Sequence, residues 1–160
     1  MKKNNNKKSD NLGDRMKKYE AVNKSNLIPK LPTVIRLDGK AFHTYTKQFK
    51  KPFDNSLINL MDQTAIYLCS KIQGAKFAFV QSDEISIYLS DRDSLEQQMW
   101  YDGEVEKMVS VSASMAAAKF NHLRFLDVLS SITKLMKITM GPRYNRIDLI
   151  DKLENMLLLK

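Results

Sequence analysis

The chain has 160 residues, 43% of them hydrophobic, which is enough for one domain with a buried core. No apolar run approaches the roughly 20 residues that span a bilayer, and no apolar stretch follows the N-terminal lysines. We therefore expect a cytoplasmic protein without a membrane segment or signal peptide. A single cysteine, Cys69, excludes a disulfide framework and a cysteine zinc cluster.

The formal charge of +8 is distributed unevenly. Residues 1–18 carry +5, residues 19–118 carry −1 and residues 119–160 carry +4. Basic ends favour attraction to a polyanion, whereas the acids concentrated in the middle favour metal or acid chemistry there. For residues 1–9 the alternative is a simple solvated tail.

Residues 1–12 are polar and basic with almost nothing to bury, so we expect a disordered tail. Helical spacing predicts a short helix over 14–23. Two prolines then favour extended chain, followed by a strand over 33–37. The mixed aromatic and basic stretch after Gly39 is typical of a turn of helix and a loop.

Apolar residues recur every four positions after Asp54, which predicts an amphipathic helix that is capped by Asp54 and ends before Gly74. Branched and aromatic runs predict strands over 77–80 and 85–89, joined by a tight connection. A loop and a second helix over 104–120 follow. The order β-α-β-β-α predicts an α+β fold of the ferredoxin-like or palm type, in which one more strand should follow and pair beside the first.

The C-terminal part departs from this pattern. Helical periodicity continues over about 126–137, Gly141 and Pro142 interrupt it, and another helix is expected from about Arg146. A closing strand beside the first one has a single weak candidate, residues 134–139. We accordingly divide the chain into a basic tail (1–12), a palm-like domain (13–122) and a helical C-terminal segment (123–160).

The candidate site combines Asp38, at the end of the first strand, with Asp83, between the next two strands. Two carboxylates can hold the two Mg²⁺ ions that phosphoryl and nucleotidyl transfer use. Gly39 lets a metal or a triphosphate approach its backbone carbonyl. Glu84 follows Asp83 and is expected on the other face, as an indirect contributor. The alternative is a plain turn at Asp38 and a hairpin tip at Ser82.

Basic and aromatic residues around these acids leave further alternatives. Lys51, Lys107 and His43 could meet a triphosphate, although such side chains are more often simply solvated. Residues 76–80, KFAFV, partly match an RNA-recognition strand but lack its glycine and last aromatic residue. A non-catalytic RNA-binding module is therefore the second hypothesis, although the acids that follow would repel phosphates unless metal is bound.

Several motifs occur together and in order: GDRMK at 13–17, RLDG at 36–39, KPFD at 51–54, QSDE at 81–84 and the small residues of 110–118. In this combination the chain resembles the tRNA-histidine guanylyltransferase family of 3′ to 5′ polymerases, over roughly residues 13–122. The resemblance does not extend beyond residue 122, so an inactive truncated member is another alternative.

The resemblance implies a polymerase-like palm that adds GTP, or another nucleotide, to the 5′ end of a tRNA after activation by ATP. Such a reaction would serve tRNA-His maturation or tRNA 5′-end repair. It implies that Asp38, Asp83 and the Gly39 carbonyl hold two Mg²⁺ ions, with Glu84 in support. The resemblance also implies that His43, Lys51 and Ser82 contact the triphosphate, and less securely that Lys107 does. It implies a tetramer as well.

Overall fold

The computed structural model describes residues 11–140. The expected disordered tail falls almost entirely outside this range, as does the helix expected from residue 146. The main elements are α1 (Leu12–Ala21), β1 (Thr33–Asp38), α2 (Phe42–Tyr45), α3 (Asn55–Lys71), β2 (Ala75–Gln81), β3 (Glu84–Leu89) and α4 (Val105–Met140). Two 3₁₀ turns, η1 (Thr46–Gln48) and η2 (Trp100–Gly103), complete the list.

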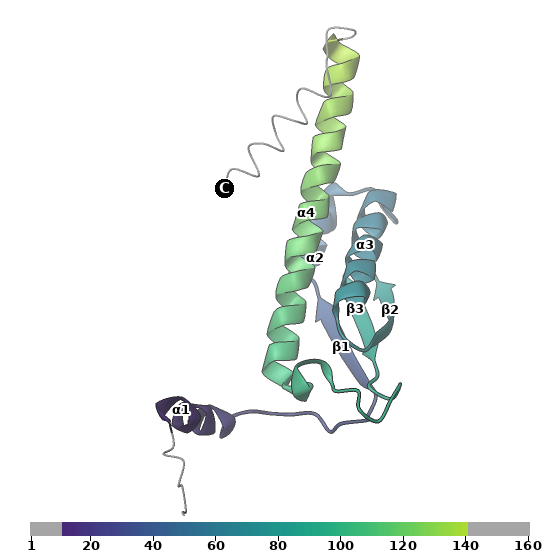
Figure 1. Cartoon of the computed structure of the whole chain (residues 1–160). Helices are drawn as coiled ribbons and strands as arrows, with labels where there is room; N and C mark the ends of the chain where they lie inside the picture. The colour runs from purple at the N-terminus through teal and green to yellow at the C-terminus, as the bar shows by residue number, and fades with distance from the viewer. Residues whose placement is uncertain (1–10, 141–160) are drawn as a thin grey trace, which may run out of the picture.

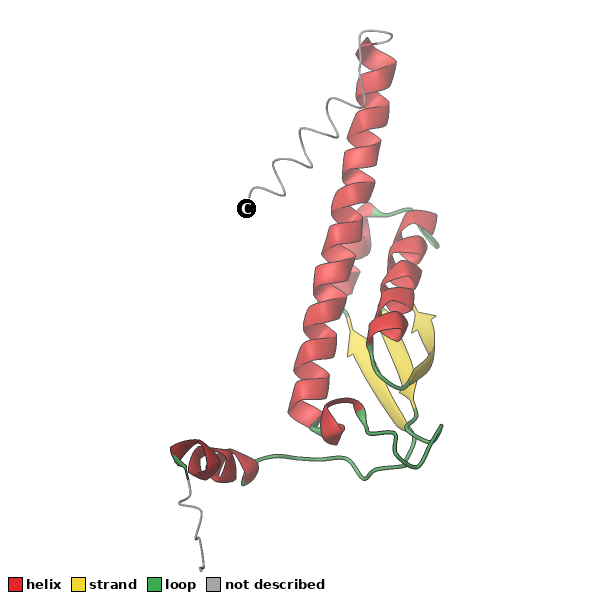
Figure 2. Cartoon of the chain, in the orientation of Figure 1, coloured by secondary structure: helices red, strands yellow, loops and turns green. Residues whose placement is uncertain are grey.

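The three strands form one antiparallel sheet in the order β1-β3-β2. Helices α3 and α4 both lie on one side of this sheet and pack against each other (Figures 1 and 2). The expected α+β palm-like arrangement, with the order β-α-β-β-α, is therefore confirmed. In the described part of the chain no helix has the length and hydropathy needed to cross a membrane.

Side chains alternate between the two faces of the sheet, as they do in any strand. On the face toward the helices, Ile35, Ile85, Ile87 and Leu89 are buried. They form the core with one side of α3, including Met61 and Leu68, and with Trp100 and Met108. The apolar residues that recur every four positions along α3 therefore bury one face of the helix, as the sequence predicts.

The other face of the sheet, which we call the open face, is not covered by α3 or α4. The strand register arranges its side chains in three rows across β1, β3 and β2. These rows are Val34, Tyr88 and Phe77; Arg36, Ser86 and Phe79; and Asp38, Glu84 and Gln81. Consecutive rows are about 7 Å apart, the length of two extended residues.

Helix α3 begins as predicted, with Asp54 as its N-cap. The Asp54 carboxylate accepts hydrogen bonds from the backbone N–H groups of Ser56 at 2.9 Å and Leu57 at 3.1 Å. It also accepts one from the Lys50 N–H at 3.0 Å, which ties the preceding loop to the helix. These hydrogen bonds, with that of Lys50 the strongest influence, lower the pKa of the Asp54 carboxyl.

The C-terminal part of the described chain differs from the expectation. A single helix, α4, runs through both segments that we expected to be separate helices. The expected closing strand over 134–139 is wrong, because these residues belong to α4. Residues 104–140 contain no glycine or proline, so nothing in them interrupts the helical hydrogen bonds. Strand β1 consequently has no neighbour on its outer side within residues 11–140.

Candidate functional site

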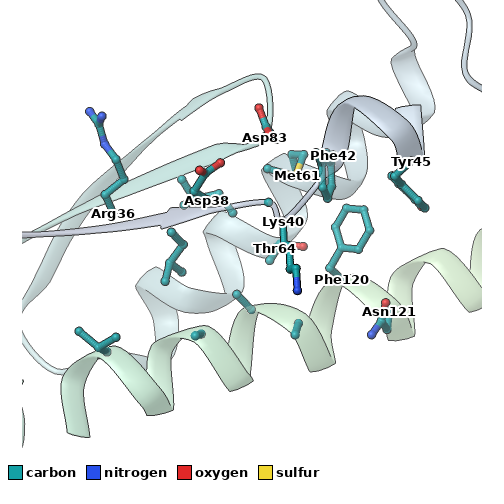
Figure 3. A pocket seen from close by; sticks show the side chains of 17 residues that line it. Arg36, Asp38, Lys40, Phe42, Tyr45, Met61, Thr64, Asp83, Phe120 and Asn121 are labelled. Atoms are coloured by element: carbon teal, nitrogen blue, oxygen red, sulfur yellow. The ribbon is translucent and has the colours of Figure 1, made fainter. Parts of the chain in front are cut away.

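A cavity of about 540 Å³ lies between the end of β1 and the middle of α4 (Figure 3). Its walls are largely apolar, with Leu37 and Ile85 from the sheet and small residues such as Ala113 and Ala117 from α4. Its polar residues come from several elements. They are Arg36 and Asp38 of β1, Lys40, Tyr45 of α2, Thr64 of α3, Asp83 of the turn between β2 and β3, and Asn121 of α4.

Asp38 and Asp83, 45 positions apart in the sequence, both line this cavity, so the fold brings them together; that they form a shared metal site stays a prediction. Asp38 is the last residue of β1 and is the cross-strand partner of Glu84. Asp83 is the second residue of the two-residue loop between β2 and β3. In Figure 3 the two carboxyl groups lie near each other, on the side of β1 that faces away from α4.

The hairpin that carries Asp83 depends on the conformation of Ser82. Ser82 has a φ of 57°, and a positive φ at the first loop residue is typical of the tight turns that match the twist of paired strands. The turn closes with Gln81 opposite Glu84. Backbone geometry thus fixes Asp83 directly beside the end of β1.

Gly39 is required by the close approach of Phe42. A Cβ atom at position 39 would lie 2.3 Å from Cδ2 of Phe42, well inside contact distance. Phe42 in turn packs against Tyr45 and Phe120, with ring centroids 5.1 Å and 5.6 Å away. The Gly39 carbonyl accepts a 3.3 Å hydrogen bond from the Phe42 N–H, and a carbonyl oxygen has a second lone pair for another partner.

Glu84 does not line the cavity. We expected its side chain on the other face from Asp83; its pairing with Asp38 places it on the open face, and its indirect role stays a prediction. Its Oε2 atom lies 3.5 Å from the Arg36 guanidinium, whose Nε also donates to Ser86 Oγ at 3.3 Å. Glu84 therefore has a cationic partner of its own beside the two aspartates.

Ser82 and the remaining predicted site residues do not line the cavity. His43 and Lys51 are exposed in the segment that follows β1, and the His43 ring contacts the Thr44 hydroxyl at 3.1 Å. Lys107 lies near the start of α4, where its ammonium is 3.0 Å from Glu104. This contact lowers the pKa of Glu104 and raises that of Lys107.

The cavity is also lined by residues that we did not predict from the sequence as part of the site. Lys40 lines the cavity and directly follows Gly39 in the sequence. This neighbouring position is the sequence feature that could have predicted its place in the site. Thr64, Phe120 and Asn121 come from helices and reach the cavity only through tertiary packing. The Thr64 hydroxyl donates to the Leu60 carbonyl at 2.7 Å, which satisfies it within α3.

The donors at this site fit a hard cation. Asp38 and Asp83 offer carboxylate oxygens and Gly39 a carbonyl oxygen, which are the ligand types that Mg²⁺ prefers. Within residues 11–140 no group of three His, Cys, Asp or Glu side chains is placed to hold a metal ion. Mg²⁺ usually binds through one or two carboxylates together with water and substrate phosphates, so the two aspartates meet that requirement.

Solved structures with a similar fold include a bacterial tRNA(His) guanylyltransferase-like protein in complex with GTP. It is 47% identical, covers 70% of this chain and 51% of its own, and has a TM-score of 0.66. Its complex with ATP is also 47% identical, covers 71% and 50% of the two chains, and has a TM-score of 0.66. The Schizosaccharomyces pombe tRNA(His) guanylyltransferase is 34% identical over 117 residues, 71% of this chain and 42% of that protein.

Two helices on one face of an antiparallel sheet, with two aspartates at one end of that sheet, define an α+β domain of the polymerase-palm class. The family model described as tRNAHis guanylyltransferase (Thg1) matches residues 13–138. The chain therefore belongs to the tRNAHis guanylyltransferase family, which confirms the resemblance seen in its motifs. It spans about half the length of the relatives described above.

Proposed function

We propose that this chain is a metal-dependent nucleotidyltransferase that adds GTP, or another nucleoside triphosphate, to the 5′ end of a tRNA in the 3′ to 5′ direction. The observation that carries the proposal is that Asp38 and Asp83 line the same cavity, Asp38 as the cross-strand partner of Glu84 and Asp83 in the turn directly before Glu84. Membership of the tRNAHis guanylyltransferase family supports the same reaction and the same substrate class. Cytoplasmic location and assembly into a tetramer belong to this proposal as well.

The residues of the chain have separate roles in this proposal. Asp38, Asp83 and the Gly39 carbonyl would hold Mg²⁺, which when bound neutralises triphosphate charge and activates the attacking hydroxyl. Lys40 and Arg36, two further residues of the lining, would add positive charge for phosphate oxygens, Arg36 from the open face beside Glu84. Ser82, in the turn beside Asp83, can donate its hydroxyl hydrogen to a phosphate.

Nucleotide choice is the second part of the proposal. The bacterial relatives in the two complexes hold GTP and ATP, and this chain shares 47% sequence identity with them. We propose that this chain accepts both, ATP for activating a 5′-monophosphate and GTP for the addition itself. His43 and Lys51 remain our candidates for contacting the triphosphate from the exposed segment after β1.

The test is transfer of label from GTP onto a 5′-triphosphorylated tRNA by the full chain, with and without Mg²⁺. Asp83→Asn should reduce Mg²⁺-dependent transfer by a factor of about 100 or more, because loss of one electrostatic contact in a transition state has that order of effect. Asp62→Asn, the same substitution at an exposed position of α3, is the matched control and should leave transfer unchanged. Equal transfer by wild type and Asp83→Asn would refute the proposal.

Binding gives a second readout that does not depend on turnover. Calorimetric titration of GTP into the full chain should show tighter binding with Mg²⁺ than with chelator. Asp38→Asn should remove most of that difference, because the bound cation then loses one of its two carboxylates. GTP binding that ignores both Mg²⁺ and Asp38→Asn would argue for a nucleotide- or RNA-binding protein without this metal chemistry.

A further inference from the structure

Two phenylalanines stand in the open face of the sheet, where the helices leave them exposed. Phe77 is 59% exposed and Phe79 is 61% exposed, although both are in a central part of β2. Burying such a side chain stabilises a protein by about 1.5–3 kcal/mol, so the fold gains little from these rings where they are. Exposed apolar groups that lie together are typical of an interaction surface.

The rings of this surface are arranged for stacking. Phe77 lies on Tyr88 of the neighbouring strand, with ring centroids 5.0 Å apart and planes 12° from parallel. Phe79 stands in the next row, across Ser86 from Arg36. The open face thus presents an aromatic pair, then an aromatic ring with a guanidinium, and both groups provide flat surfaces for a base.

The sequence motif of this strand agrees with its geometry. In the partial RNA-recognition match over residues 76–80, alternation puts both phenylalanines on the open face and leaves Ala78 and Val80 on the helix side. Its missing last aromatic falls at Ser82, in the hairpin turn. Tyr88 supplies a third ring from the adjacent strand.

The third row brings this surface to the proposed reaction site. Asp38, Glu84 and Gln81 form that row, and Asp83 lies in the turn beside it. The Arg36 guanidinium, 3.5 Å from Glu84, offsets one of the acids that would repel a phosphate backbone. An RNA strand crossing the rings would therefore reach the carboxylates within about 7–14 Å, the spacing of one or two rows.

We propose that the open face binds unpaired RNA bases next to the reacting end of the substrate, which stack on Phe79 and on the Phe77–Tyr88 pair. Bases in a duplex are about 3.4 Å apart along a strand, whereas the rows are about 7 Å apart, so the spacing suits splayed single-stranded nucleotides. The exposed Arg36 and the aromatic character of the rings favour this occupant over an aliphatic protein surface. The inference rests on the proposed function for the identity of the polymer as tRNA.

The experiment measures fluorescence anisotropy of a labelled, unstructured RNA octamer with the full chain, in chelator and without nucleotide. Phe79→Ala should weaken binding by about 5-fold to 100-fold, the range for loss of one base–aromatic stack. Phe79→Leu should weaken it as well, because leucine keeps apolar surface but has no aromatic face. Phe79→Tyr should retain binding within about 3-fold of wild type.

Two controls make the result specific to this face. Phe125→Ala removes a phenylalanine that is 45% exposed on α4 and should not change the affinity. A blunt duplex of the same sequence should bind at least 10-fold more weakly than the single strand. Circular dichroism and the midpoint of thermal unfolding verify that each variant is folded. If Phe79→Ala does not fold, Phe77→Ala provides an independent test of the same surface.

The outcomes separate this inference from the proposed function. If Asp83→Asn binds the octamer like wild type while Phe79→Ala does not, the stacking surface stands even where nucleotide transfer fails. If Phe79→Leu binds like wild type, or duplex and single strand bind alike, the stacking inference is overturned. It is also overturned if the wild type binds no RNA but self-associates in sedimentation through Phe79, because the face is then an interface between copies.

Discussion

The guanidinium of Arg36 lies 3.5 Å from Oε2 of Glu84, on adjacent strands of the open face. This pair gives Glu84, the third acid, a cationic partner beside the two aspartates that line the cavity. Asp38 is exposed and Asp83 only partly buried, so both carboxylates remain accessible to a cation. The pairing explains how three acids fit at one end of a small sheet.

We expect Glu84→Gln to have a small effect on nucleotide transfer, at most about 10-fold, because Glu84 has its own cationic partner. Stability should also change by less than about 1 kcal/mol, since the pair is largely exposed to solvent. Steady-state kinetics and urea denaturation of this variant, beside Asp83→Asn, give both numbers. A loss as large as that of Asp83→Asn would mean that Glu84 contacts the metal directly.

Gly39→Ala should destabilise the fold by about 1–3 kcal/mol, the usual cost of forcing extra volume into a packed site. The new Cβ would collide with the Phe42 ring, which then moves away from Tyr45 and Phe120. Urea denaturation checks the size of the effect. If the collision is the cause, Gly39→Ala combined with Phe42→Leu will cost less than the sum of the two single changes, whereas strict additivity would contradict this explanation.

Asp54 makes stability depend on pH at the start of α3. Its pKa is lowered in the folded chain, chiefly by the Lys50 N–H, so the unfolded state binds the proton more readily. The stabilising contribution is complete above the ordinary value of 3.8 and is lost as the pH falls through the lower folded value. The midpoint temperature of thermal unfolding of Asp54→Asn should therefore change less between pH 3 and pH 6 than that of wild type. If the midpoints of the two proteins change with pH by the same amount, Asp54 does not cause this pH dependence.

The core prediction compares two residues of the same helix. Leu68 is fully buried between α3 and the sheet, whereas Ile66 is 60% exposed. Leu68→Ala should lower the free energy of unfolding by about 2–5 kcal/mol, the range for a buried leucine that leaves a cavity. Ile66→Ala should change it by about 0.5 kcal/mol or less. Similar losses in both variants would show that the apolar face of α3 is not oriented as described.

Much of this fold could be predicted from local pattern. Strand β1 and helix α3 follow from apolar spacing, and the Asp54 cap follows from a single residue type at the right place. The long α4 could not be predicted from periodicity, because residues 121–125 have no clear apolar stripe, yet a helix needs only its backbone hydrogen bonds to continue. The absence of glycine and proline between Gly103 and Gly141 was the better signal.

The site divides in the same way. Asp38 and Asp83 could be paired from the sequence, because strand ends and hairpin turns are local features that a sheet brings together. Asn121 and Thr64 could not, since they reach the cavity only through helix packing. For Lys107 the sequence indicates an ion pair with Glu104 instead of a contact with the triphosphate. Glu104 lies three residues before Lys107, a spacing at which opposite charges pair on a helix.

The alternation of side chains along β1, β2 and β3 has a consequence for how this protein can change over evolutionary time. Residues that hold the fold together and residues proposed to meet RNA occupy opposite faces of the same strands, so we expect neighbouring codons to be under different selection. Substitutions of Phe77 or Phe79, which are 59% and 61% exposed, should leave the packed core untouched. Preference for one RNA over another can therefore drift through the outward positions while the inward ones stay constrained.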